Sequence, residues 1–130
     1  MRELEYITAI QKKYSGKRDN SKEILVASGI EHPFVVEDHG EDIGCIYLHF
    51  EPQMNPSMVW VMYLRSYFPG KGYGTGMMNM LCELADKMGV RLYLEPVPDQ
   101  GSNRTQGELA AFYRRFGFEG SITMQRSPIA

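Results

Sequence analysis

The sequence has few cysteines, no long apolar run and no excess of either charge. Its two cysteines, Cys45 and Cys82, match no metal-binding or redox spacing, so we expect buried free thiols in a reducing cytoplasm. No stretch approaches the roughly 20 apolar residues of a membrane helix, and residues 1–14 mix charge into every turn, unlike a signal peptide. We therefore expect a cytoplasmic protein without a metal site or a membrane partner.

The near balance of charge also bears on partners and size. With 14 basic and 16 acidic residues, the formal net charge is −2. This leaves no overall positive field for nucleic acid, so nucleic acid is not an expected partner. The chain has 130 residues, of which 43% are hydrophobic, and this is the size and composition of one domain with one core. We expect that domain to span residues 1–130.

Hydrophobic periodicity predicts an alternation of helices and strands. Apolar residues at spacings of three and four predict a first helix that carries Leu4, Ile7, Ile10 and Tyr14. Residues 22–29 are expected to form a second, shorter helix ending at Gly29. The remaining predicted elements are a β-hairpin at 32–50, a buried strand at 58–64, a helix at 77–88, a strand at 90–97, a helix at 108–117 and a strand at 121–126. Strand-helix-strand units after residue 58 predict an α/β fold with a partly parallel or mixed sheet.

Residues 69–76 read PGKGYGTG and connect the buried strand to the helix at 77–88. A glycine-rich turn at this place offers free backbone N–H groups and the positive end of a helix dipole, which suits a pyrophosphate. The spacing differs from the dinucleotide fingerprint, and Lys71 lacks the hydroxyl residue that follows the lysine of a phosphate-binding NTPase loop. A nucleotide-binding regulatory domain and a plain connecting turn stay open as alternatives.

A longer pattern around these glycines resembles a known family. The stretch YLRSYFPGKGYGTGMMNMLCELADKMGVRLYLEP, followed by FYRRFGF, is similar to the GNAT superfamily of acyl-CoA-dependent N-acyltransferases, over about residues 43–119. The resemblance implies an α/β fold with a GNAT-like mixed central sheet and helices on both faces, truncated at both ends. It also implies that acetyl-CoA is the co-substrate and that an acetyl group passes directly to a primary amine of a small molecule, peptide or protein.

The resemblance assigns the cofactor contacts residue by residue. Gly72 and Gly74 fall on the family glycines that hold the CoA pyrophosphate, and we call residues 70–76 the glycine elbow. Pro69 replaces the usual Gln or Arg, so Lys71 or Tyr73 is expected to compensate. The end of the buried strand is expected to hold the pantetheine arm, with the Leu64 N–H facing the thioester oxygen. The full set of expected cofactor contacts is Met62, Leu64, Gly70, Lys71, Gly72, Tyr73, Gly74, Thr75, Gly76, Asn103 and Gln106.

Two residues are the expected catalytic groups. Tyr113 lies where the family places the phenol that protonates the departing thiolate, and a pKa near 10 suits that step. Glu95 ends its strand where some members place the general base. The alternatives are a core aromatic role for Tyr113 and, for Glu95, a solvated charge or an ion pair with Arg104. Further alternatives are His49 or Glu51 as the base, and Arg65, Arg114 or Arg115 as ligands of the adenosine 3′-phosphate.

The acceptor and the rival function stay open at this level. Short ends would leave an open groove for a peptide amine, or a second subunit would complete the site in a homodimer. Acidic residues at the hairpin tip would attract a cationic amine, and they are Glu37, Asp38, Glu41 and Asp42. The rival to an acetyltransferase is a catalytically idle CoA-binding or protein-interaction module with the same fold.

Overall fold

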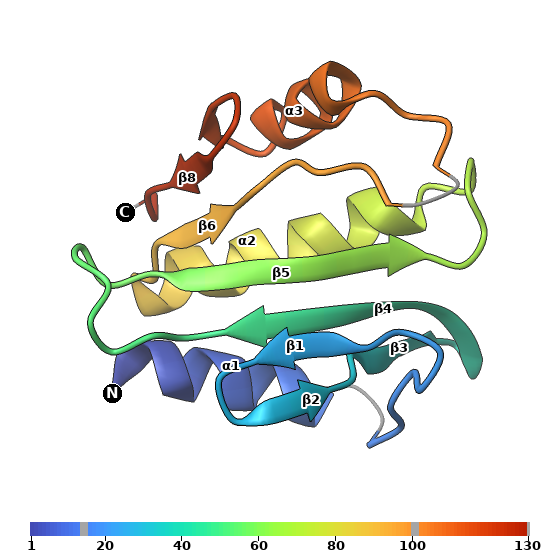
Figure 1. Cartoon of the computed structure of the whole chain (residues 1–130), viewed down its shortest axis with the longest axis horizontal. Coiled ribbons are helices and arrows are strands. Elements are labelled where there is room, and N and C mark those ends of the chain that lie inside the picture. Colours follow the sequence, from blue (N-terminus) through green and yellow to red (C-terminus); the bar gives the residue numbers. More distant parts are fainter. Residues whose placement is uncertain (14–15, 100–101, 130) are drawn as a thin grey trace.

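The structure is a computed structural model that describes residues 1–13, 16–99 and 102–129. The elements follow one another along the chain as shown in Figure 1: α1 (Arg2–Lys13), β1 (Ile24–Val26), β2 (Gly29–Glu31), β3 (Phe34–Asp38), β4 (Glu41–His49), β5 (Val59–Ser66), α2 (Tyr73–Met88), β6 (Leu92–Leu94), α3 (Gln106–Arg114), β7 (Glu119–Gly120) and β8 (Met124–Arg126). Six strands form one sheet in the order β3-β4-β5-β6-β8-β7, and β1 pairs with β2 separately. Within the sheet the β5–β6 pair is parallel and the others are antiparallel, so the expected mixed sheet is confirmed.

Helices α1 and α2 lie behind the sheet in the view of Figure 1, and the β1–β2 hairpin lies in front of it. The Tyr6 hydroxyl donates a 2.7 Å hydrogen bond to the Leu81 carbonyl and joins the two helices. Each fully buried apolar side chain contributes roughly 1.5–3 kcal/mol relative to exposure. One cluster of such side chains fills the space between sheet and helices, and it includes Tyr6, Ile10, Ile46, Val59, Leu81 and Leu92.

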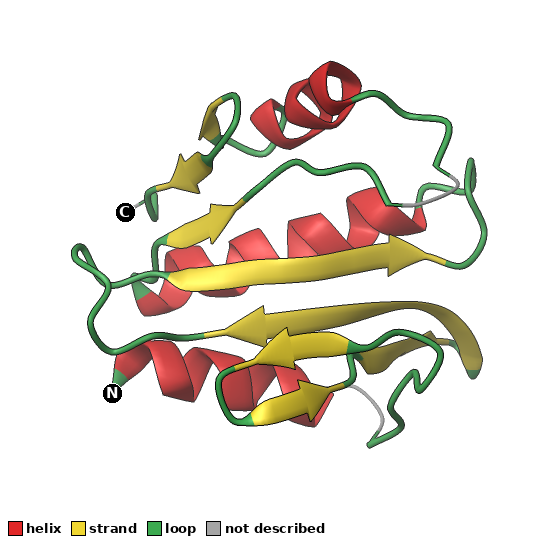
Figure 2. Ribbon diagram, viewed as in Figure 1, coloured by secondary structure: helices red, strands yellow, loops and turns green. Residues whose placement is uncertain are grey.

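The helix expected at 22–29 is wrong, because this segment forms the β1–β2 hairpin (Figure 2). Ile24 is buried whereas Leu25 is 80% exposed, which is the period-two alternation of a strand. A short apolar run does not distinguish a strand from a helical turn by periodicity alone. Gly29 adopts a φ of 130° and opens β2, so it does not end a helix.

Several element boundaries differ from the expected ones for local reasons. Helix α2 begins at Tyr73, four residues before the expected start, because Gly72 already acts as its N-cap. Helix α3 begins at Gln106 because Thr105 and Glu108 form a capping box, in which each side chain accepts from the other residue's N–H. Strand β6 is shorter than expected, because Pro96 and Pro98 have no N–H to donate to a sheet.

Cys45 and Cys82 are both free and buried, as expected. Burial raises the pKa of each thiol to about 11, so neither is a thiolate near neutral pH. Among the described residues, no helix is long and apolar enough to cross a membrane. The same part of the chain holds no group of three His, Cys, Asp or Glu side chains arranged to bind a metal ion.

Candidate active site

Strands β5 and β6 separate after the first two residues of β5. Their pairing is confined to Val59 with Leu92 and Trp60 with Tyr93, whereas β5 continues to Ser66. Figure 1 shows the chain beyond β6 turning away from β5 toward α3. The result is a V-shaped opening along which the backbone of β5 beyond Trp60 has no neighbouring strand on the β6 side.

A β-bulge in β5 lies at the narrow end of this opening. Tyr63 pairs with Tyr47 of β4, and Val61 pairs with Leu48, so Met62 is the extra residue without a partner on β4. Beyond the bulge, Leu64 packs against the core cluster and Tyr63 faces the β1–β2 side. The structure therefore brings Met62 and Leu64 of the predicted cofactor set to the opening, and their hydrogen bonds to a pantetheine arm stay a prediction.

The glycine elbow leaves most of its backbone N–H groups without a hydrogen bond in the described part of the chain. Gly70 and Gly72 have φ of 85° and 79°, a left-handed conformation that favours glycine. The first bond of α2 runs from the Gly76 N–H to the Gly72 carbonyl, 3.0 Å apart. No acceptor among the described residues bonds the N–H groups of residues 70–75, and Gly72 provides no side-chain cap. These amides, together with the positive end of the helix dipole, form the kind of site that binds phosphate oxygens.

At two further positions of the elbow, neither backbone conformation nor packing within the protein requires glycine. Gly74 and Gly76 have no positive φ. A Cβ at Gly76 would meet nothing within 4 Å, and one at Gly74 would meet only the tip of Phe112, at 3.9 Å. Glycine inside a helix costs roughly 0.5–1 kcal/mol relative to alanine, so these residues weaken the free protein. The space above them fits a bound group that must approach the backbone closely.

This cradle leads to a prediction for Gly74→Ala. We expect the substitution to raise the free energy of unfolding by up to about 1 kcal/mol, because alanine favours the helix. We also expect it to weaken CoA binding about tenfold, because a Cβ would occupy the space next to the free amides. Denaturant unfolding measures the first effect and isothermal calorimetry with CoA measures the second.

The matched control is Asn79→Ala, at an exposed position of the same helix. It should also raise stability, by roughly 0.5 kcal/mol, while leaving CoA affinity unchanged. Equal CoA affinity of Gly74→Ala and the original protein would show that no phosphate lies close to Gly74.

Helix α3 lies against the first turn of α2, since Phe112 is the neighbour of Gly74. Tyr113 makes edge-to-face contacts with Phe112 and Phe118, at centroid distances of 5.2 and 6.0 Å. Burial raises the pKa of Tyr113, which the nearby Arg104 partly offsets. Among the described residues, none accepts a hydrogen bond from the Tyr113 hydroxyl, so the proton is available to a bound substrate.

Arg104, which the sequence suggested only as a partner of Glu95, and Arg115, one of the candidate phosphate ligands, both lie near the first turn of α2. The guanidinium groups of Arg104 and Arg115 lie 5.0 and 5.8 Å from the centre of the Phe112 ring, beside Gly74. Through Phe112 they bring positive charge to the side of the first turn of α2. Arg114 instead donates to the Gly120 carbonyl, at 3.0 Å. The sequence signal was present in the FYRRFGF motif, but it did not reveal which arginine faces the elbow.

Other predicted cofactor contacts are placed less directly. Lys71 and Asn103 are exposed, and Thr75 lies in the first turn of α2. The Tyr73 hydroxyl donates to Glu41, at 3.1 Å. The group of Tyr73 that remains available to a cofactor at the elbow is therefore its main-chain N–H. The Gln106 amide donates to the Ser121 carbonyl, at 2.6 Å. The roles of these residues toward a cofactor stay predictions.

Glu95 lies at one end of a continuous row of side chains that crosses three strands. It accepts a 2.8 Å hydrogen bond from the Tyr93 hydroxyl, and Tyr93 contacts Trp60 with ring centroids 5.5 Å apart. Trp60 in turn contacts His49, at 6.3 Å, and the His49 Nε2 bonds Glu51, at 2.5 Å. We call these five residues the aromatic row. The alternative of a Glu95–Arg104 ion pair is not found among the described contacts, since Arg104 stacks on Phe112.

A second set of contacts bridges the wide part of the opening. The Tyr63 hydroxyl donates to Asp99 at 2.6 Å, and the Lys22 ammonium lies 3.8 Å from the same carboxylate and 4.7 Å from the centre of the Tyr63 ring. Burial and the Asp99 carboxylate raise the pKa of Tyr63. This bridge joins the chain before β1, strand β5 and the loop after β6.

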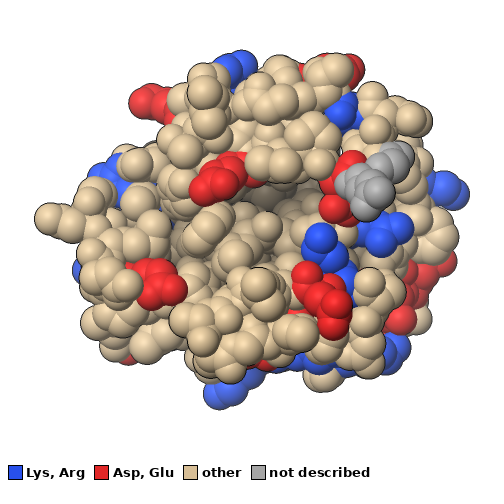
Figure 3. Space-filling view, in the orientation of Figure 1, with Lys and Arg blue, Asp and Glu red and all other residues tan. Residues whose placement is uncertain are grey.

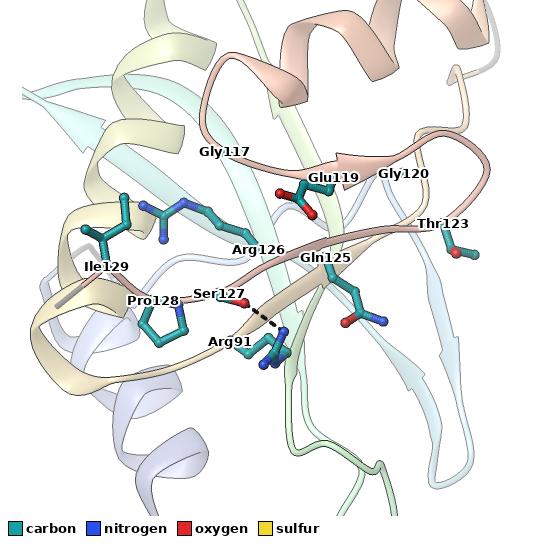
Figure 4. A pocket seen from close by; sticks show the side chains of 10 residues that line it. All are labelled: Arg91, Gly117, Glu119, Gly120, Thr123, Gln125, Arg126, Ser127, Pro128 and Ile129. Carbon is teal, nitrogen blue, oxygen red and sulfur yellow. Dashed lines mark hydrogen bonds between the residues drawn. The ribbon is translucent and has the colours of Figure 1, made fainter.

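Figure 3 shows this face of the molecule hollowed between the chain after β6 and the strands below it, with carboxylates at the rim. A separate cavity of about 550 Å³ lies at the β8 edge and is lined by Arg91, Glu119, Thr123, Gln125 and Arg126 among others (Figure 4). Arg91 points across it and donates to Ser127, at 2.8 Å. None of the elbow residues lines that cavity, so we place the candidate site at the V-shaped opening.

Comparisons with known proteins agree with this architecture. The family described as the acetyltransferase (GNAT) domain matches residues 29–120. The comparison with curated proteins found no match. One similar solved structure is Arabidopsis thaliana Naa50 in complex with the bisubstrate analogue CoA-Ac-MVNAL, with 18% identity, a TM-score of 0.50 and coverage of 97% of this chain and 93% of that one. Another is an acyl-CoA N-acyltransferase from Pseudomonas aeruginosa, with 17% identity, a TM-score of 0.52 and coverage of 96% and 86%.

The family match spans most of the chain, so the protein belongs to the GNAT acetyltransferase family. At this level of identity the two solved structures show a shared fold. The particular substrates are a separate question, which the geometry of the opening addresses.

Proposed function

We propose that the protein transfers an acetyl group from acetyl-CoA to a primary amine. The observation that carries this proposal is the V-shaped opening between β5 and β6, which leads to the free amides of the glycine elbow. A long, narrow cofactor with a pyrophosphate at one end and a thioester at the other fits this shape. The Naa50 structure holds an analogue that joins CoA to a peptide, and this supports the same pair of substrate classes here.

The residues of the opening divide the chemistry between them. Glu95 accepts the proton that an ammonium must lose before its nitrogen attacks the thioester carbon. The Leu64 N–H donates to the carbonyl oxygen as negative charge develops there. When the carbon–sulfur bond breaks, Tyr113 gives its proton to the departing thiolate. Because burial raises the pKa of Tyr113, this phenol stays protonated at neutral pH and is ready to act as an acid.

The cofactor half of the proposal is tested by isothermal calorimetry with CoA. We expect saturable binding of CoA and much weaker binding of ATP and NAD, because the elbow and the opening together match pyrophosphate plus pantetheine. Absence of CoA binding would contradict the proposal. Preferential binding of ATP or NAD would favour a nucleotide-binding regulatory domain.

The catalytic half is tested by following thiol release from acetyl-CoA with a panel of amines. We expect release that depends on both the amine and the protein. Pro69 favours the second candidate, an idle CoA-binding or protein-interaction module, because it removes a side chain that usually holds the phosphates. CoA binding without thiol release for any amine would support that candidate. A homodimer and a cytoplasmic location stay predictions of the sequence.

A further inference from the structure

The chain makes few hydrogen bonds where it leaves strand β5 and enters the glycine elbow. Pro69 has no N–H, and most N–H groups of the elbow have no acceptor among the described residues. The Phe68 N–H donates to the Ser66 hydroxyl, at 3.3 Å, which is a contact within the same turn. The direction of the elbow amides therefore depends on how the two ends of the elbow are held. One end is the first turn of α2, and the other end follows Tyr67.

Tyr67 is held through both its main chain and its side chain. Its N–H donates to the Ile43 carbonyl of β4, at 2.9 Å. Its side chain is half-buried, and the hydroxyl donates to a carboxylate oxygen of Asp19, at 2.5 Å. Burial and this hydrogen bond raise the pKa of Tyr67, so the hydroxyl keeps its proton and remains a donor. Two separate hydrogen bonds thus fix the residue from which the chain enters the elbow.

Asp19 is itself fixed, because it belongs to a segment that pairs with the start of β3. An antiparallel bridge joins Arg18 to Phe34, and the Asp19 N–H donates to the Pro33 carbonyl, at 2.8 Å. One oxygen of the Asp19 carboxylate accepts from both the N–H and the hydroxyl of Ser21, at 3.0 and 2.5 Å. These bonds orient the carboxylate and leave its second oxygen for the contact with β5.

The hydrogen bond between Asp19 and Tyr67 reaches across strand β4. The sheet order is β3-β4-β5, Asp19 lies beside the start of β3, and Tyr67 follows the end of β5. In Figure 1 the segment before β1 and the chain after β5 lie at the same end of the sheet. Hydrogen bonds from Ser21 and Tyr67 lower the pKa of Asp19, so the acceptor is an ionised carboxylate, which strengthens the bond. The entrance of the elbow is therefore tied to the β3 edge of the sheet.

We propose that Asp19 is a positioning residue for the cofactor, which acts through Tyr67 to hold the glycine elbow in the conformation that receives a pyrophosphate. A site whose donors are already oriented binds its ligand more tightly, because less conformational freedom is lost on binding. The part of this assignment that concerns CoA rests on the proposed function. The hold of Asp19 on the elbow is a property of the free protein, and it is measured without CoA.

The first test measures trypsin cleavage after Lys71 in the free protein, with fragments identified by mass spectrometry. Lys71 is exposed in the elbow, whereas Lys87 is exposed within α2 and serves as the internal reference for unfolding. We expect Asp19→Ala and Tyr67→Phe to speed cleavage after Lys71 about tenfold relative to cleavage after Lys87. The control Glu23→Ala removes an exposed carboxylate from the same segment and should change neither rate.

Two outcomes of the cleavage test would overturn the proposal. Unchanged cleavage after Lys71 in Asp19→Ala would show that the elbow is held without this carboxylate. Equal acceleration after Lys71 and Lys87 would show that Asp19 stabilises the whole fold and does not position the elbow.

The second test measures CoA affinity by calorimetry and the steady-state kinetics of thiol release. We expect Asp19→Ala and Tyr67→Phe each to weaken CoA binding and to raise KM for acetyl-CoA about tenfold, with kcat unchanged, since orientation of the elbow acts on binding. The double variant should bind CoA as well as either single variant, because both changes remove the same hydrogen bond. Asp19→Asn keeps an acceptor oxygen and should lose less affinity than Asp19→Ala.

The binding test separates this proposal from the proposed function. Unchanged CoA affinity in both single variants, or additive losses in the double variant, would overturn the role of Asp19 and leave the acetyltransferase in place. Absence of CoA binding by the original protein would reject the proposed function, and the role of Asp19 toward CoA with it. The cleavage after Lys71 would in that case still decide whether Asp19 holds the elbow.

Discussion

Replacement of Tyr113 by phenylalanine should lower kcat for acetyl transfer by about a hundredfold or more. General acids contribute typically 10²–10⁴-fold, and phenylalanine removes the donated proton without changing the ring. The hydroxyl has no bond to any described residue, so its loss leaves no buried partner without a hydrogen bond. The measurement is steady-state thiol release, together with calorimetric CoA binding, which should change by less than twofold.

The matched control for this variant is Tyr47→Phe. Tyr47 is also half-buried, burial also raises its pKa, and it lies on β4, away from α3. Its replacement should leave kcat unchanged. If Tyr113→Phe retains full kcat, Tyr113 is a core aromatic residue, in agreement with its contacts to Phe112 and Phe118. The departing thiolate would then take its proton from another donor.

The parts of the site that depend on local sequence were predictable. The glycine elbow is a contiguous pattern. The backbone at positions 70 and 72 is left-handed, a conformation that favours glycine, so the sequence itself shows where the turn lies. Tyr113 was named because a short motif carries it, and its role as the acid stays a prediction. The C-terminal end of α2 was equally local, since Gly89 adopts a φ of 69° and its N–H bonds the Ala85 carbonyl.

The parts that depend on distant segments were not predictable. The aromatic row joins residues from three strands, and their adjacency follows from a register that no local pattern encodes. His49 was named only as an alternative base, and its sequence position did not indicate that its side chain is only 20% exposed and contacts Trp60. The bulge at Met62 adds one residue to β5, and periodicity cannot reveal such an insertion. The error at 22–29 has a local origin, because the short apolar run that forms β1 does not distinguish a strand from a helical turn.

Replacement of Asp86 by asparagine should destabilise the fold by about 3–5 kcal/mol. Arg126 is buried, with a side chain 5% exposed, and both of its terminal nitrogens bond Asp86, at 2.8 and 3.0 Å. Removal of one partner of such a pair leaves a buried charge without compensation. Asp86 also accepts from the Ile129 N–H, at 2.9 Å, while Arg126 donates to the Phe116 carbonyl, so the pair ties α2 to β8 and to the end of α3.

The pH dependence of stability gives an independent check on the Asp86–Arg126 pair. Hydrogen bonds from Arg126 hold the pKa of Asp86 below its usual value. The contribution of the Asp86 carboxylate to the free energy of unfolding is therefore fully present above its pKa in the unfolded chain, about 4. That contribution is lost as pH falls through the depressed folded pKa. The difference in free energy of unfolding between the original protein and Asp86→Asn, measured by urea denaturation, should therefore shrink only below about pH 4.

The control Asp38→Asn alters an exposed carboxylate and should change stability by less than about 0.5 kcal/mol. The double variant Asp86→Asn with Arg126→Met should be more stable than Asp86→Asn alone, because no unpaired charge remains buried. If the single variant loses less than about 1 kcal/mol, the carboxylate does not compensate the Arg126 charge. Stability in that case rests on the apolar cluster. Packing alone would then hold the end of α3 to α2 and keep Phe112 beside the elbow.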